Sequence, residues 1–73
     1  MALRYVGVDP DTNKSGSPTV WVDEETGDFV FQGWKLDQAT LANVLATGPV
    51  PDHETVVRLP RRMAAIIAEA VGQ

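Results

Sequence analysis

Residues 19–34, TVWVDEETGDFVFQGW, decide the fold because two β-rich segments flank a short turn. Thr19–Asp23 and Asp28–Trp34 are both rich in valine, phenylalanine and tryptophan, which are typical of strands. Gly27 can adopt the positive φ that closes a short hairpin loop. The stretch therefore predicts an antiparallel hairpin.

The turn also fixes which side chains share a face of the sheet. If Asp23 faces Asp28, Trp21 lies on the same side as Val30. The opposite side then holds two Val–Phe pairs, which we expect to face the core: Val22 with Phe29 and Val20 with Phe31.

The rest of the chain adds one strand before the hairpin and a helix–strand–helix unit after it. This order, β-β-β-α-β-α, predicts an α+β fold for residues 1–73 as one domain, with both helices packed on a small mixed sheet. The expected segments are a strand at Ala2–Val8, a loop at Pro10–Pro18, a helix from Asp37 to Gly48, a strand at Thr55–Leu59 and a helix at Arg61–Val71.

Each predicted helix has a cap and an apolar stripe. The Asp37 carboxylate can accept from the backbone N–H of Ala39 or Thr40. Gly48 and Gly72 can end the two helices. The expected buried residues are Leu41, Val44 and Leu45 in the first helix, and Met63, Ile66, Ile67 and Ala70 in the second.

Composition excludes several classes of protein. The 73 residues include six basic and ten acidic side chains, for a net charge of −4, and no cysteine. An acidic chain argues against a nucleic-acid binder and against an anionic membrane surface. Without cysteine, disulfides and zinc–thiolate sites are impossible. Apolar runs are too short for a membrane span or a signal peptide, so we expect a cytoplasmic protein.

Asp9, Asp11 and Asn13 resemble the start of a calcium-binding loop, in which alternate oxygens surround one cation. The pattern then fails, because Lys14 replaces the required glycine and Val20 the closing glutamate. An ordinary polar loop is the simpler interpretation, and no cofactor is predicted.

Tyr5–Asp11 (YVGVDPD), followed by Ser15–Gly16 and a hairpin, resembles the opening of ribonuclease H-like proteins, including Holliday-junction resolvases. The resemblance implies a divalent-metal-dependent nuclease with Asp9 as a metal ligand, and a fourth strand beside the first. The sequence departs from that pattern, because Asn43 stands where a glutamate is expected and no acid ends Thr55–Leu59. The alternative for Asp9 is an Asx-turn at the end of a strand.

Three longer segments resemble small uncharacterised actinobacterial proteins encoded near helix-turn-helix regulators and BldB- or WhiJ-like proteins. They are Tyr5–Thr12, Ser17–Asp37 and Val56–Met63. The resemblance implies a regulatory context and names no activity or catalytic residue.

Three arginines, Arg58, Arg61 and Arg62, surround the start of the last helix. They predict either a receptor for a carboxylate or other anion, or a set of charges neutralised by the acidic half of the same chain. Cations are unfavourable at a helix N-terminus, so replacing Arg61 and Arg62 by glutamine is expected to leave stability unchanged or slightly higher. With Val57 and Met63, these residues form the predicted partner-binding surface.

No complete catalytic set is recognisable. His53 lies between two acids in a proline-rich loop, which favours a solvated side chain. Trp21 and Trp34 are not both expected in so small a core. The sequence therefore favours a non-catalytic interaction module that forms a homodimer or binds a partner protein. The metal-dependent nuclease is the alternative, and a DNA-binding regulator is disfavoured by charge and element order.

Overall fold

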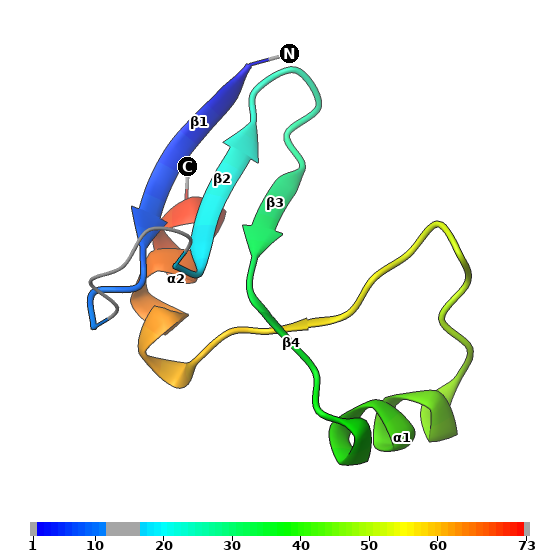
Figure 1. Ribbon diagram of the computed structural model, residues 1–73. Helices are drawn as coiled ribbons and strands as arrows, with labels where there is room; N and C mark the ends of the chain where they lie inside the picture. Colours follow the sequence, from blue (N-terminus) through cyan, green and yellow to red (C-terminus); the bar gives the residue numbers. More distant parts are fainter. Residues whose placement is uncertain (1, 12–16, 73) are drawn as a thin grey trace.

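The computed structural model describes residues 2–11 and 17–72 and confirms the α+β class (Figure 1). No helix in these two ranges is long and apolar enough to cross a membrane. The elements are β1 (Leu3–Val8), β2 (Thr19–Asp23), β3 (Phe29–Gln32), β4 (Trp34–Lys35), α1 (Gln38–Thr47), β5 (Val57–Arg58), a short 3₁₀-helix (Arg61–Met63) and α2 (Ala64–Val71).

The hairpin register is confirmed. Strands β1, β2 and β3 form an antiparallel sheet in that order. The backbone N–H of Asp23 donates to the carbonyl of Asp28 at 2.8 Å, and Gly27 has a φ of +82°. The paired residues are those predicted: Val20 with Phe31, Trp21 with Val30 and Val22 with Phe29.

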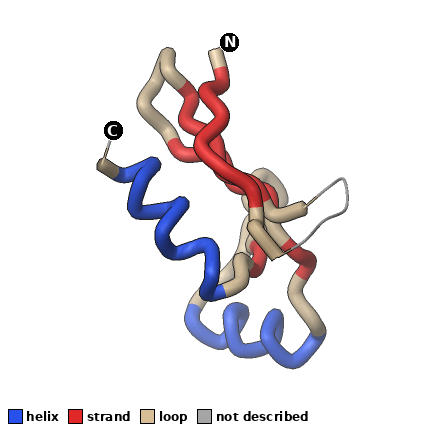
Figure 2. Tube along the Cα trace, turned by 90° about the vertical axis from the view of Figure 1, so that its left-hand side faces the viewer, coloured by secondary structure: helices blue, strands red, loops and turns tan. Residues whose placement is uncertain are grey.

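The core lies between this sheet and α2, which runs along one face of it (Figure 2). Gly7 of β1 lets the helix approach closely, because a Cβ there would lie 2.9 Å from Ile66 Cγ2. The predicted stripe of the last helix is confirmed as part of the core. The buried residues of the core are Val20, Val22, Met63 and Ala70, and the half-buried residues packed against them are Val6, Leu59, Ile66 and Ile67.

Two predictions about the strands are wrong. The expected strand Asp28–Trp34 is interrupted at Gly33, where β4 leaves the sheet. The expected strand Thr55–Leu59 is reduced to β5, which pairs antiparallel with β4. In residues 2–11 and 17–72, all strand pairs are therefore antiparallel, so the predicted mixed sheet is wrong, and β5 pairs with β4 rather than lying beside β1 as the ribonuclease H-like order implies.

Strand β4, helix α1, the following loop and β5 form an arm, residues 34–59, that points away from the sheet (Figure 1). Asp37 caps α1 as predicted, accepting from the Thr40 N–H at 3.1 Å. The expected burial of the α1 stripe is wrong, since Leu41 is 39% exposed and Leu45 51% exposed. The radius of gyration is 13.5 Å, against about 11 Å for a compact domain of this length.

Gly27 generates the first prediction. A Cβ there would meet nothing within 4 Å, so the cost of a larger residue comes from its positive φ alone. We expect Gly27→Val to lower the free energy of unfolding by roughly 1–2 kcal/mol in urea denaturation. Gly27→Asn is the control and should lose less, because asparagine tolerates the left-handed region. Equal stability of the valine variant and the parent would contradict this turn.

Gly33 generates the second prediction. A Cβ at Gly33 would lie only 2.6 Å from the backbone carbonyl oxygen of Arg58, so the two strands of the arm meet here with no room for a side chain. We expect Gly33→Ala to destabilise the protein by about 1–3 kcal/mol and to speed amide exchange in β5. Gly48→Ala is the control, because a Cβ at Gly48 meets nothing within 4 Å and its φ of 166° suits any residue. Matching losses in the two variants would contradict this account.

Candidate functional site

An ion pair between a buried carboxylate and a partly exposed arginine joins the end of β1 to the segment that starts α2. Asp9 is 1% exposed, and its backbone N–H donates to the carbonyl of Pro18 at 2.9 Å. Arg62 donates from Nε to Asp9 Oδ1 at 2.6 Å and from Nη2 to Oδ2 at 2.7 Å. This bidentate geometry is the strong form of an arginine–carboxylate pair. Asp9 and Arg62 therefore fix α2 against the sheet.

Arg62 has two further neighbours. Its Nε lies 3.6 Å from a carboxylate oxygen of Asp11, and its guanidinium carbon lies 5.9 Å from the ring centre of Trp34. The hydrogen bond with Asp9 is the main cause that raises the pKa of Arg62 above its usual value. The guanidinium stays charged and connects β1, the 3₁₀-helix and the base of the arm.

The structure separates the residues of the predicted partner-binding surface. Met63 is fully buried, so it belongs to the core and presents no surface to a partner. Arg62 is held by Asp9, as the neutralised-charge interpretation predicted. Arg58, Arg61 and Val57 remain exposed.

Arg58 contacts residues at the start of α1 within the arm. Its Nη2 donates to the Thr40 hydroxyl at 2.7 Å and lies 4.0 Å from an oxygen of Asp37. The hydrogen bond with Thr40 is the main cause that lowers the pKa of Asp37, and Arg58 contributes further. Arg58 and Arg62 thus contact different parts of the molecule, and sequence proximity does not make them one site.

The residues around Asp9 do not fit a two-metal nuclease. Both oxygens of its carboxylate accept from Arg62, and Oδ1 also accepts from the N–H of Asp11 at 3.0 Å, which is the predicted Asx-turn. Within residues 2–11 and 17–72, no three His, Cys, Asp or Glu side chains lie close enough together to hold a metal ion. The calcium-loop hypothesis also involves Asn13, which lies outside the described residues.

His53 is a surface residue in the arm. Its side chain is 81% exposed and its Nε2 lies 3.6 Å from the carboxylate of the adjacent Glu54. The solvated interpretation is consistent with this exposure, since a general acid or base works in a cleft beside its substrate.

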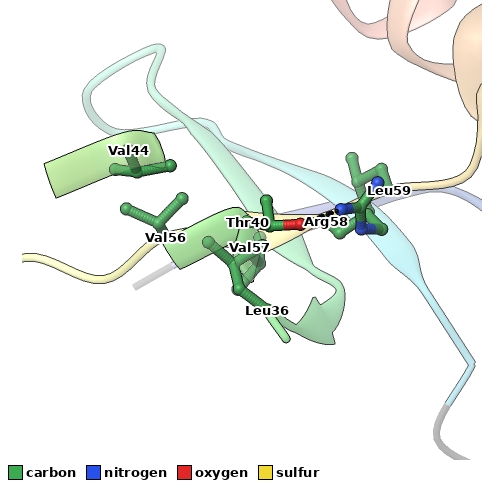
Figure 3. A pocket seen from close by; sticks show the side chains of 7 residues that line it. All are labelled: Leu36, Thr40, Val44, Val56, Val57, Arg58 and Leu59. Atoms are coloured by element: carbon green, nitrogen blue, oxygen red, sulfur yellow. Dashed lines mark hydrogen bonds between the residues drawn. The ribbon is translucent and has the colours of Figure 1, made fainter. Parts of the chain in front are cut away.

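A groove of about 320 Å³ lies between α1 and β5 in the arm (Figure 3). Aliphatic side chains form most of it, and the Arg58–Thr40 hydrogen bond spans one end. The sequence prediction found only Val57 and Arg58 of this set. It missed Leu36, Thr40 and Val44 because they come from a distant segment of the chain, and it did not single out the flanking Val56 and Leu59. The lining residues are Leu36, Thr40, Val44, Val56, Val57, Arg58 and Leu59.

The molecule exposes more total surface than a compact monomer of its mass, and several large apolar side chains are part of that surface. Its accessible surface is 5450 Å², whereas a folded monomer of 7.9 kDa exposes about 4400 Å². Large apolar side chains at least 36% exposed occur on β1, β3, β4, β5 and α1 and at the C-terminal end of α2. They are Leu3, Tyr5, Val8, Phe29, Phe31, Trp34, Leu41, Leu45, Val57 and Val71.

Phe29 and Phe31 show why the predicted core face is only half covered. They share the α2 side of the sheet with Val22 and Val20, which are buried, yet Phe29 is 49% exposed and Phe31 40% exposed. The helix covers β1 and β2 and leaves β3 open. We call Phe29 and Phe31 the open β3 face. Trp21, on the opposite side of the sheet, is half-buried.

No protein-family model, curated protein or solved structure matches the chain. Any functional assignment therefore rests on the surface of the molecule, which exposes many large apolar side chains. The described residues contain no group of three side chains that could hold a metal ion.

The Asp9–Arg62 pair generates the third prediction. We expect Arg62→Gln to lower the urea midpoint clearly, because the buried Asp9 carboxylate then loses its bidentate contact with a guanidinium. Arg61→Gln is the matched control, one residue away and exposed, and should leave the midpoint unchanged. This corrects the expectation that both arginines are dispensable for stability. Equal midpoints for the two variants would show that the pair is not structural.

Proposed function

We propose that this protein is a non-catalytic interaction module, which acts by binding another protein or a second copy of itself through apolar surface on its arm and sheet. One observation carries the proposal: about 1000 Å² more surface is exposed than a monomer of this mass normally exposes. A stable protein–protein interface buries about 800 Å² on each partner. The surplus is thus the size of one interface.

The chemistry of the exposed residues supports a protein partner. Leucine, phenylalanine and tryptophan side chains supply the apolar area, and aromatic residues are enriched at protein interfaces. Nucleic acid is disfavoured by the net charge of −4. We further propose a cytoplasmic location, because a chain without cysteine needs no oxidising compartment.

The alternative nuclease function gains no support from the site. A metal ion at Asp9 would have to displace Arg62 from both carboxylate oxygens. A regulatory context, which the resemblance to small actinobacterial proteins implies, is compatible with an interaction module and identifies no partner.

The proposal predicts that charge on the α1 stripe abolishes binding without unfolding the protein. In affinity capture from the native cell, a tagged variant with Leu41→Glu and Leu45→Glu should lose whatever the parent retains, including untagged copies of itself. Both leucines are exposed, so circular dichroism should match the parent.

The matched control carries Asn43→Glu and Ala46→Glu, which add the same charge to other exposed positions of the same helix. It should retain the parent's partners. Capture of nothing by the parent, together with a monomer in sedimentation equilibrium, would overturn the proposed function.

A further inference from the structure

The direction of the arm is fixed by packing at its base. Strands β4 and β5 pair through Trp34 with Arg58 and Lys35 with Val57. Gly33 approaches the carbonyl of Arg58 so closely that a Cβ would lie 2.6 Å from it. The Arg62 guanidinium also lies over the Trp34 ring, 5.9 Å from its centre. These contacts hold the arm in an extended position, and α1 does not pack on the sheet of its own chain (Figures 1 and 2).

Helix α1 lacks the charged outer face that a solvent-exposed helix normally has. It contains no charged residue in its ten positions, QATLANVLAT. Thr40 and Val44 line the groove against β5, and Leu41 and Leu45 lie on the neighbouring face, exposed. Solvent-exposed helices normally carry charges on their outer face. An uncharged helix with exposed leucines indicates an interface.

The open β3 face offers a complementary site. Phe29 and Phe31 lie beside α2 on the sheet face where a second helix would complete the layer. In the same chain α1 is held away from them by the arm. One molecule therefore exposes two apolar pairs, Leu41 with Leu45 and Phe29 with Phe31. Because the arm points away from the sheet, the two pairs do not contact each other within the same chain.

We infer that the occupant of each surface is a second copy of this chain, with the arms exchanged. In this dimer, Leu41 and Leu45 of one copy pack on Phe29 and Phe31 of the other, and the reciprocal contact follows by twofold symmetry. The inference deepens the proposed function by naming the partner.

Area and charge both fit a second copy. The chain exposes about 1000 Å² more total surface than a compact monomer, which leaves enough open surface for the roughly 800 Å² that each partner of a standard interface buries. Each copy carries a net charge of −4, and like charges across an interface are costly. Because α1 is uncharged, this contact brings two acidic molecules together without placing carboxylates opposite each other.

Cysteine cross-linking tests the contact directly, because the parent chain contains no cysteine. Leu41→Cys or Leu45→Cys is mixed with Phe29→Cys or Phe31→Cys and oxidised with glutathione disulfide. We expect at least one of the four mixtures to give a heterodimer of twice 7.9 kDa, or 15.8 kDa. Asn43→Cys, on the far side of α1, replaces the leucine variants as the control and should give none with either phenylalanine variant.

Sedimentation equilibrium of the parent at tens of micromolar should give the same 15.8 kDa, and the Leu41→Glu, Leu45→Glu variant should give 7.9 kDa. A monomeric parent would overturn the inference, as would a dimer that yields no cross-link in the four mixtures. So would a chain with both Leu45→Cys and Phe31→Cys that closes its disulfide as a monomer.

The two proposals can fail separately. A monomeric parent that retains another protein through the α1 stripe would refute the arm exchange and leave the interaction module standing. A monomeric parent that retains nothing would refute both.

Discussion

The ion pair between Asp9 and Arg62 is the contact on which the rest of the structure depends. It joins residues 53 positions apart and closes α2 over a sheet that has only three strands. Because the sheet is small and the helix is short, few side chains are completely buried. The bidentate ion pair at their junction therefore contributes a large share of the stability of this packing. Because both carboxylate oxygens of Asp9 accept from Arg62, a metal ion at Asp9 would have to displace the guanidinium.

Once α2 is fixed, the core is complete without α1. Val20 and Val22 pack against Met63 and Ala70, and no residue of α1 is buried. The arm is therefore not needed to bury the core, and its side chains can serve another purpose. The close packing of Gly33 on the carbonyl of Arg58 holds the base of the arm together. Trp34, at the start of the arm, lies under the Arg62 guanidinium, so the arm also contacts the residue that fixes α2. One arginine thus supports both the core and the direction of the arm.

Local patterns in the sequence predicted the parts of the fold that local physics controls. The hairpin register, the positive φ of Gly27, the Asp37 cap and the buried stripe of α2 follow from turn chemistry and periodicity. The placement of α1 and β5 could not be predicted in this way, because periodicity shows that a helix has an apolar face and not what covers it. The same limit applies to Arg62, whose partner is distant in sequence.

An exposed apolar helix has consequences for stability as well as for recognition. Any partner that binds only the folded form raises its stability by mass action, and for a homodimer this gain depends on protein concentration. Here the surface that remains open is about one interface in area, on a domain whose own core is small. Phe29 and Phe31 belong to the sheet that forms the core, yet α2 leaves both side chains exposed. In the proposed dimer, the same two side chains would stabilise both the fold and the contact between copies. In the proposed dimer, the arm of one copy would cover the open β3 face of the other.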